Sequence, residues 1–401
     1  MNGRMIDVAI VGGGLAGGLI ALALIRARPE CRIELIESGA MLGGNHRWSW
    51  FASDLSAEGE ALLESFRQTR WDQGYDVQFP RLRRTLAAGY RSLTSADFHF
   101  ALQRLLPQGA IRLNTSVASL DAESVMLDGG ERISARAVID CRGFAPTPHL
   151  RGGWQVFMGR HIRFDAAHGI KRPVIMDAAV TQNAPVGNGG AYRFVYLLPI
   201  AAHELFIEDT YYADSPAFDP SLLSGRIDRY AERHGWGDGA DASQETGVLP
   251  VITGGDFNAY LKQMQVPGVA LAGARGGFTH PLTSYTLPIA VENALAIAAR
   301  GDLAGPQLAA FVENRARAHW RKTTIYRALG RMLLKAAEPD RRVDIFQRFY
   351  GLPERLIERF YACRSTLPDK ARILIGKPPV PIPRAIRALA GKGNPLAMEK
   401  V

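Results

Sequence analysis

The sequence predicts an α/β protein in which a parallel sheet is joined to an inserted antiparallel sheet and to a helical, basic C-terminal region. Three observations predict this class. A glycine-punctuated strand–helix–strand pattern opens the chain, strand-like runs occupy residues 154–212, and apolar pairs recur at helical spacing after residue 343. The chain has 401 residues, 47% hydrophobic and 22% charged, so it is long and apolar enough to bury a sizeable core.

The N-terminal segment carries a dinucleotide-binding pattern. A β-branched apolar run at 5–11 is followed at once by glycines in the spacing GxGxxG, by a helical stretch from Leu15 to Arg28, and by a second strand-like run at 32–37. Pro29 ends the helical stretch because proline cannot comfortably continue a helix. Strand, glycine turn, helix and second strand in this order predict a Rossmann-like unit that binds a dinucleotide.

The residue types in the glycine turn each have a physical task. Gly12 permits the tight turn, Gly14 lets the backbone approach a pyrophosphate, and Gly17 lets helix and strand pack closely. Glu37 ends the second strand and can accept hydrogen bonds from ribose hydroxyls, which favours FAD or NAD over NADP, and the N-terminal position favours resident FAD. The alternative is a glycine-rich turn that serves only packing, but it does not explain why an acidic residue, Glu37, ends the second strand. The predicted cofactor contacts are Gly12, Gly13, Gly14, Leu15, Ala16, Gly17 and Glu37.

Two later segments have the pattern of strands that return to the same sheet. Residues 135–143 form a strand-like run followed by a glycine-ended turn, and residues 268–277 form a strand-like run that enters a glycine-rich turn. Flavoproteins commonly carry an Asp where this chain has Ala274, so backbone donors or a neighbouring arginine must serve there. A plain strand-to-helix connection is the alternative for the first segment. The predicted cofactor contacts are Asp140, Gly143, Gly273 and Arg275.

These returning segments predict how the chain is divided. An FAD-binding domain made of residues 1–150 and 265–315 is interrupted by a substrate domain at 151–264 that is rich in antiparallel strands. Residues 316–401 form a basic helical region that we expect to associate with a membrane.

The middle of the chain offers a candidate acid. Strand-like runs at 174–177, 192–199 and 204–210 predict an antiparallel sheet. Glu208 and Asp209 are adjacent in the last run, so alternation sends their side chains to opposite faces. If Glu208 points into an apolar pocket, desolvation raises its pKa and keeps it protonated, as a general acid requires, and Asp209 pushes in the same direction. The alternative is a solvated charge pair at the end of a strand.

Other kinds of site are not expected. The three cysteines are scattered, which argues against a disulfide framework or a CxxC metal site and favours a reducing cytoplasm. The sequence has no HExxH pattern and no GxSxG pattern, so neither a metal centre nor a covalent nucleophile is predicted. No run reads as a signal peptide or as a transmembrane helix, so any membrane contact is expected to be peripheral.

Positive charge is concentrated at the C-terminal end. Residues 315–401 carry 20 Lys and Arg against 7 Asp and Glu, a net charge of +13, whereas residues 1–314 carry 28 against 32, a net charge of −4. Such asymmetry indicates an anionic partner, either nucleic acid or a phospholipid surface, and a solvated helical face is the alternative. The apolar, proline-rich and basic segment at 372–383 favours a membrane surface, and no nucleic-acid-binding motif is present.

Several motifs in this order resemble the bacterial lycopene β-cyclases of carotenoid biosynthesis, over nearly the whole chain. Where that family typically has His-Pro-Thr-Thr-Gly-Tyr, this chain has Leu282 and Ser284 within His280–Tyr285. The motifs are Val11-Gly-Gly-Gly-Leu-Ala-Gly17, Gly43-Gly-Asn-His46 with Trp48, Tyr192-Arg-Phe-Val-Tyr196, Ile207-Glu-Asp-Thr210, His280-Pro281 through Tyr285-Thr-Leu-Pro288, Arg348-Phe-Tyr-Gly-Leu-Pro353 and Gly376-Lys-Pro-Pro-Val-Pro381.

The resemblance implies a redox-neutral cyclisation of lycopene. An acid protonates the terminal double bond of a ψ-end, the carbocation closes a six-membered ring, and proton loss gives the β-ring; closure of both ends gives β-carotene through γ-carotene. The resemblance also implies FAD in its reduced form and NAD(P)H as electron donor. The family's acid lies in the motif that matches Ile207–Thr210, so Glu208 is the candidate acid, with Asp209 beside it.

The implied partners follow from the hydrocarbon substrate. Lycopene is held in lipid, so the resemblance implies peripheral association with the inner face of the cell membrane, and association with other enzymes of the pathway is a further expectation. The alternative enzyme class is a flavin-dependent monooxygenase or isoprenoid reductase, which would add oxygen or hydrogen to a lipophilic substrate. A flavin-bearing scaffold protein is the non-enzymatic alternative.

Overall fold

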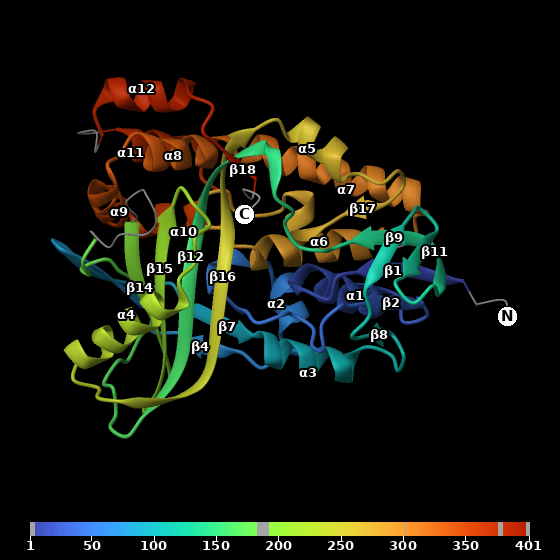
Figure 1. Ribbon diagram of the computed structural model, residues 1–401, viewed down its shortest axis with the longest axis horizontal. Helices are drawn as coiled ribbons and strands as arrows, with labels where there is room; N and C mark the ends of the chain where they lie inside the picture. The colour runs from blue at the N-terminus through green and yellow to red at the C-terminus, as the bar shows by residue number, and fades with distance from the viewer. Residues whose placement is uncertain (1–4, 183–191, 301, 376–379, 398–401) are drawn as a thin grey trace.

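A computed structural model describes residues 5–182, 192–300, 302–375 and 380–397. Figure 1 shows a parallel sheet with its helices in the right half of the view, long antiparallel strands in the left half, and the C-terminal helices α11 and α12 above those strands. The predicted fold class, a Rossmann-like α/β unit with an antiparallel sheet and a helical C-terminal region, is confirmed.

The first sheet contains the predicted dinucleotide-binding unit. Its parallel strands run in the order β8, β2, β1, β11, β17, and β10 and β9 continue it in antiparallel fashion from β11. The glycine turn joins β1 to α1, and α1 packs against α6. The strands are β1 Ile6–Val11, β2 Ile33–Ile36, β8 Ile111–Arg112, β9 Val117–Leu120, β10 Ser124–Leu127, β11 Arg132–Asp140 and β17 Ala270–Leu271.

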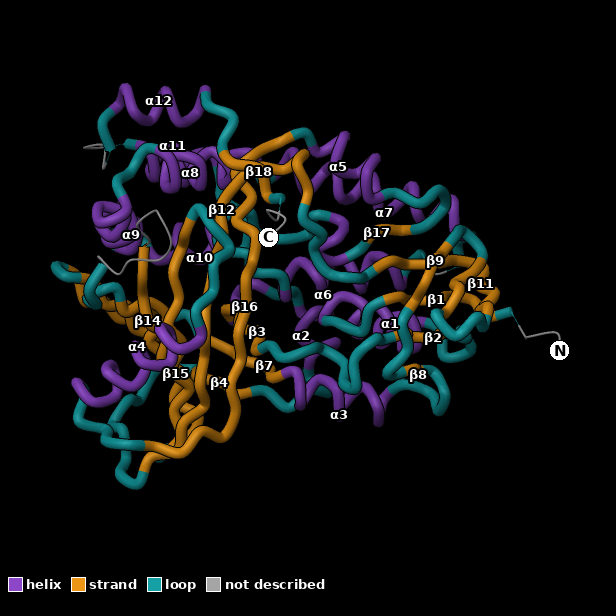
Figure 2. The backbone as a smooth tube through the Cα atoms, viewed as in Figure 1, coloured by secondary structure: helices purple, strands orange, loops and turns teal. Residues whose placement is uncertain are grey.

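The second sheet is built around two long strands, β12 and β16, which cross the molecule side by side (Figure 2). Its order is β16, β12, β15, β14, β13, β5, β6, and β18 pairs with the edge of β12. The strands are β5 Tyr75–Phe79, β6 Leu82–Leu86, β12 Thr147–Phe164, β13 Val174–Asp177, β14 Tyr192–Ala201, β15 Glu204–Ala213, β16 Gly239–Gly255 and β18 Asn394–Leu396. A small third sheet contains β3 Arg47–Phe51, β4 Thr69–Trp71 and β7 Tyr90–Thr94.

The chain passes between the two large sheets more often than the sequence indicates. Strands β5 and β6 belong to the second sheet although they come from the first 150 residues, and β5 pairs in parallel with β13. Strand β18 returns from the C-terminal region to pair with β12. The second sheet therefore combines strands from the N-terminal, middle and C-terminal parts of the chain.

Helices cover the sheets on several sides. Helix α4 packs against β12 and β15, on one face of the second sheet, and α8 packs against β12 and β16. The helices are α1 Leu15–Ala27, α2 Ala57–Leu63, α3 Ser95–Leu105, α4 Pro220–Arg233, α5 Phe257–Met264, α6 Leu287–Ala298, α7 Gly305–Lys322, α8 Thr324–Lys335, α9 Arg342–Tyr350, α10 Glu354–Tyr361, α11 Leu367–Leu374 and α12 Ile382–Ala390, with short 3₁₀ turns at Ala52–Asp54, Gly273–Gly276 and Pro339–Arg341.

The C-terminal helices follow the predicted amphipathic pattern. Helices α9 and α10 bury one apolar side each, in a cluster rich in aromatic side chains that also includes Tyr75, Tyr90 and Tyr192. In the described part of the chain, no helix is both long enough and apolar enough to cross a membrane. Residues 376–379 of the proline-rich motif lie outside the described residues.

Candidate active site

The glycine turn between β1 and α1 has the geometry of a phosphate cradle. Gly12 has φ +103°, and a Cβ there would lie 2.8 Å from the backbone nitrogen of Arg142. A Cβ on Gly17 would collide with the carbonyl oxygen of Gly12, whereas a Cβ on Gly14 would meet no atom within 4 Å. There is thus no room for a side chain at Gly12 or Gly17, but there is free space beside Gly14. Helix α1 begins directly after Gly14, with Leu15 and Ala16. This shape fits a pyrophosphate at a helix N-terminus.

Glu37 is fixed at the carboxyl end of β2 by two backbone donors. The amide of Gly13 donates to Oε2 of Glu37 at 2.7 Å, and the amide of Gly39 donates to Oε1 at 2.7 Å. The carboxylate thus lies directly beside the glycine turn. Carboxylate lone pairs beyond these two bonds are available to ribose hydroxyls, which is the geometry expected for an adenosine end of FAD or NAD.

The other predicted cofactor residues gather at the same edge of the parallel sheet. Asp140 is the register partner of Val11, and its carboxylate accepts hydrogen bonds from the guanidinium of Arg142 at 2.9 and 2.8 Å. Arg275 donates to the carbonyl of Arg142 at 2.7 Å and lies 3.4 Å from Asp140. Gly273, with φ +59°, approaches Ala16 so closely that a Cβ there would lie 2.8 Å from it.

The space at this edge is also consistent with a ligand. A Cβ on Gly143 would meet no atom within 4 Å, as at Gly14. The three predicted segments, around residues 12–17, 140–143 and 273–275, therefore meet where the carboxyl ends of parallel strands converge, which is the ligand-binding edge of this fold. The residues present fit FAD.

A short connection links this edge to the second sheet. The amide of Gly43 donates to the carbonyl of Gly13 at 2.9 Å, and Nδ2 of Asn45 donates to the carbonyl of Gln244 on β16 at 2.9 Å. The backbone amide of Arg47 donates to the carboxyl of Glu245 on β16. Residues 43–47 thus join the glycine turn directly to β16, which is separated by β12 from β15, the strand of the candidate acid.

The candidate acid lies in a row of residues across the second sheet. Glu208 on β15 is the register partner of Tyr196 on β14 and of Gly159 on β12, and Gly159 is the register partner of Glu245 on β16. Directly paired residues in an antiparallel sheet face the same side. Tyr196, Glu208 and Glu245 therefore project from one face, and Gly159, between the two glutamates, contributes no side chain of its own.

Glu208 has the properties expected of a general acid. Burial raises its pKa to about 7, although a hydrogen bond from the Thr210 hydroxyl at 2.6 Å and the positive charge of Arg47 both act to lower it. The side chain keeps some accessible surface. A carboxyl with a pKa near 7 is protonated in a large fraction of molecules at neutral pH, so it can donate a proton and take one back.

The sequence did not identify Glu245. Its side chain is 7% exposed and is hydrogen-bonded to Glu208, and burial together with the charge of Glu208 raises its pKa well above the usual range. The glutamate belongs to β16, whose first half is polar and largely exposed, so neither hydrophobic alternation nor a motif marks it. Only the pairing of β16 with β12 brings it to the site.

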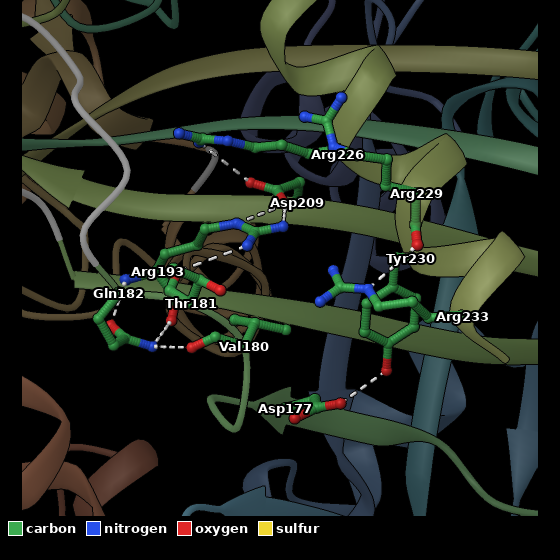
Figure 3. A network of polar contacts seen from close by, with 10 residues as sticks. All are labelled: Asp177, Val180, Thr181, Gln182, Arg193, Asp209, Arg226, Arg229, Tyr230 and Arg233. Atoms are coloured by element: carbon green, nitrogen blue, oxygen red, sulfur yellow. Dashed lines mark hydrogen bonds and ion pairs between the residues drawn. The ribbon is translucent and has the colours of Figure 1, made fainter.

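Asp209 faces the other side of the sheet, as the alternation of β15 predicts. Figure 3 shows its carboxylate beside two arginines: Arg193 on β14 donates to Oδ2 at 2.8 Å, and Arg226 on α4 lies 3.6 Å from Oδ1. All three residues are buried, and Asp209 is 0% exposed. The negative charge of Asp209 nevertheless contributes to the raised pKa of Glu208.

Tyrosine side chains surround the acid. The hydroxyls of Tyr90 and Tyr285 are 3.0 Å apart, and those of Tyr196 and Tyr285 are 3.5 Å apart. Burial raises the pKa values of all three tyrosines well above 10, and the charge of Glu208 acts on those of Tyr90 and Tyr196 in the same direction. The acid therefore lies among neutral aromatic rings. Such rings can face a carbocation without reacting with it.

The turn that carries Tyr285 is held by a buried histidine. Burial lowers the pKa of His280 to about 3, and the neutral ring accepts from the amides of Leu282 and Thr283 at 3.2 Å. Ser284, which stands where the resembled family has glycine, adopts φ +56° and donates its hydroxyl to the carbonyl of Pro250 at 2.8 Å. Residue 284 thus has a left-handed backbone conformation although it is not glycine. The hydrogen bond from the Ser284 hydroxyl offsets the strain of that conformation.

Comparison with solved structures shows the fold. The chain is similar to a geranylgeranyl bacteriochlorophyll reductase-like protein from Thermoplasma acidophilum (TM-score 0.60, 13% identity, 96% of this chain and 99% of that chain). It is also similar to a salicylate hydroxylase (TM-score 0.58, 16% identity, 93% and 99%) and to a halogenase solved in complex with FAD (TM-score 0.57, 14% identity, 89% and 82%). At these identities the likeness establishes a flavoprotein fold.

Comparison with characterised sequences identifies the family. The chain is 44% identical to a lycopene beta-cyclase from Pseudescherichia vulneris and 41% identical to one from Pantoea ananas, in each case over 96% of this chain and 97% of the relative. A lycopene beta-cyclase from Paracoccus is 42% identical over the same shares. The model of the lycopene cyclase protein family matches residues 7–387. The resemblance inferred from the motifs is confirmed, and the chain belongs to the lycopene cyclase family.

Proposed function

We propose that the protein closes the ψ-ends of lycopene to β-ionone rings without net redox change, giving β-carotene through γ-carotene. The observation that carries this proposal is Glu208, on the strand of the Ile207–Thr210 motif: desolvation raises its pKa to about 7, and it lies near the neutral Tyr90 and Tyr196. A carboxylic acid in aromatic surroundings suits proton transfer to a carbon–carbon double bond, because few competing bases or nucleophiles are present.

The reaction has three steps in this proposal. Glu208 donates its proton to the terminal double bond of a ψ-end, which creates a carbocation. The neighbouring double bond attacks that centre and closes the six-membered ring, and the cation that results loses a proton to give the ring double bond. The faces of Tyr196 and Tyr285 stabilise positive charge through their quadrupoles, and their hydroxyls remain neutral because burial raises their pKa values.

Cofactor binding is assigned to the edge of the parallel sheet. The glycine turn 12–17 holds the pyrophosphate, Glu37 holds a ribose, and Asp140, Gly143, Gly273 and Arg275 shape the remaining edge. These residues would hold FAD, whose reduced form, with NAD(P)H as the source of electrons, would supply an electron-rich ring system. Asp209 supports the acid by fixing β15 through Arg193 and by its charge.

Membrane contact is assigned to α12 and its surroundings. Ile382, Ile386 and Leu389 on α12 are 61%, 62% and 40% exposed and recur at helical spacing on one side. The opposite side packs against α8, through Ala388 among others. A pocket of about 520 Å³ beside the helix has four basic side chains in its lining, Lys335, Arg384, Arg387 and Lys392, against one acidic side chain, Glu338, which pairs with Arg384. An exposed apolar stripe flanked by cations suits the interface of an anionic bilayer at the inner face of the membrane.

The test of the function is expression in a host that accumulates lycopene, followed by pigment chromatography and mass spectrometry. We expect products of unchanged mass that co-elute with γ-carotene and β-carotene. A gain in mass of one oxygen or of two hydrogens would instead assign the protein to the flavin-dependent monooxygenases or isoprenoid reductases. Unconverted lycopene in the presence of folded, flavin-loaded protein would support a scaffold role.

A further inference from the structure

We propose that Glu245 is a positioning residue that forms a two-carboxyl pair with Glu208, and that this pair holds the proton used in cyclisation. The inference rests on the proposed function, since it describes the same acid. It is carried by the contact between the two carboxyl groups and by the strand register that creates it.

The pairing of β12 with its two neighbouring strands places the side chains of Glu208 and Glu245 next to each other. Both glutamates pair with Gly159, one from each neighbouring strand, and both face the same side of the sheet. A Cβ at residue 159 would collide with the ring of Phe206, which occupies the space above the glycine. On the next row, the ring of Phe157 lies in the same way over Gly247. The two glycines thus allow aromatic rings to pack beside the carboxyl groups, which meet and are hydrogen-bonded.

One cation balances the pair. Arg47 on β3 interacts with Glu208 and Glu245, its backbone amide donates to Glu245, and its guanidinium carbon lies 4.9 Å from the centre of the Phe206 ring. The positive charge of Arg47 therefore balances one negative charge on the two carboxyl groups. Two negative charges would leave one of them unbalanced in a buried environment. Other charged or titratable groups that face the pair or the pocket beside it are His46, Arg67, Tyr90, Asp97, His161, Tyr196 and Glu204. Asp209 acts on Glu208 by its charge from the opposite face of the sheet.

Two contacting, buried carboxyl groups cannot both ionise readily, because desolvation and like-charge repulsion act together. The pair therefore retains at least one proton at neutral pH. When Glu208 gives that proton to the double bond, the pair becomes doubly charged and is strongly basic. The proton lost from the ring then returns to the pair, so that one proton enters and one leaves the substrate and no electrons are transferred.

Glu245 also connects the pair with the outside. It lies in the wall of a pocket of about 330 Å³ between the third sheet and the second, with His46, Ser95 and Gln244 among the other lining residues. This pocket gives the pair a path for exchange with solvent protons while Glu208 remains among the tyrosines.

The decisive variant is Glu245→Gln, which keeps the size and the hydrogen bond but removes the second ionisable group. The pKa of Glu245 is raised well above its usual range and that of Glu208 to about 7, so the pair keeps its last proton to a higher pH than Glu208 beside an amide can. We expect the alkaline limb of the pH profile of kcat to move down by about one unit or more, with activity within a few-fold of the original at pH 6 and roughly tenfold or more below it at pH 8. Glu232→Gln, an exposed carboxylate on α4, is the matched control and should leave the profile unchanged.

A uniform loss of activity at every pH would show that Glu245 is only structural and would overturn the proposal. A second measurement is independent of turnover: infrared spectroscopy of the flavin-loaded protein. The absorption of a buried, protonated carboxyl should persist at pH 8 in the original protein and be lost at pH 8 in Glu245→Gln. If the original protein lacks this band at pH 8, the pair does not hold a proton and the inference fails. Failure of the proposed function appears separately, as absence of β-rings with the original protein.

Discussion

Glu208 and Asp209 are adjacent in the sequence, yet they face opposite sides of β15 and meet different partners. Glu208 contacts a second carboxyl group and lies among tyrosines, whereas Asp209 is paired with two arginines beneath α4. The first environment raises the pKa of Glu208 to about 7. In the second, burial also raises the pKa of Asp209, but the charges of Arg193 and Arg226 oppose that shift. In the proposed function, Glu208 is the proton donor on one face of the strand, and Asp209 anchors the strand on the other face.

Glu208 should make stability depend on pH. Because its pKa is raised from 4.5 to about 7, the folded protein binds a proton between these values that the unfolded chain has lost. The free energy of unfolding therefore falls as pH rises through this window. Glu208→Gln, which cannot ionise, should be more stable than the original protein at pH 8 by about 3 kcal/mol, with no difference near pH 4. Urea unfolding at both pH values measures this, and an equal difference at the two would contradict it.

Asp209→Asn should weaken the fold. The substitution leaves Arg193 and Arg226 buried without an anionic partner, and removing one member of such a group costs roughly 3 to 5 kcal/mol. Urea unfolding of Asp209→Asn should show this loss, and activity per folded molecule should survive better than in Glu208→Gln. The exposed control Glu232→Gln should stay within about 0.5 kcal/mol of the original protein. A decrease in the free energy of unfolding of less than about 1 kcal/mol for Asp209→Asn would mean that burial of the two arginines does not require the charge of Asp209.

Alanine substitutions at Gly14 and Gly17 should have different effects, the first on FAD binding and the second on stability. Gly14 has φ −68° and open space around it, so Gly14→Ala should fold normally but should bind FAD at least about tenfold more weakly, because a methyl group occupies the approach to the backbone. Gly17→Ala should instead lower the thermal midpoint, since its Cβ meets the Gly12 carbonyl. Flavin fluorescence titration and thermal unfolding separate the two effects. Equal flavin affinity in Gly14→Ala and the original protein would remove the glycine turn from the cofactor site.

Local patterns predicted the first part of the site well. Strand β1, helix α1 and strand β2 follow from a contiguous run of residues, and the opposite directions of Glu208 and Asp209 follow from the period of a strand. Glu245 could not be predicted in this way. Its position depends on how β16 is aligned with β12, a pairing of segments about 80 residues apart that no local pattern encodes. The same holds for β5, which joins the second sheet by pairing with β13.

The apolar stripe of α12 should bind anionic membranes. We expect the protein to sediment with vesicles that contain phosphatidylglycerol and to bind less as salt increases, because the basic pocket beside the helix contributes electrostatically. Ile386→Glu should reduce binding by about tenfold or more, since it removes an apolar contact and adds repulsion. Phe100→Glu on α3 is the matched control, because Phe100 is 62% exposed, as Ile386 is. Figure 1 shows α3 at the bottom of the view and α12 at the top. Equal losses in both variants would exclude a specific docking face.

The most direct test of the account compares Glu208→Gln with the original protein, each purified with FAD bound, reduced, and supplied with lycopene in vesicles. The account predicts that Glu208→Gln retains the flavin absorbance and the fold but forms no γ-carotene or β-carotene, while Glu232→Gln forms both at the original rate. Formation of β-rings by flavin-loaded Glu208→Gln would contradict the central claim, because the proton would then have to come from another group.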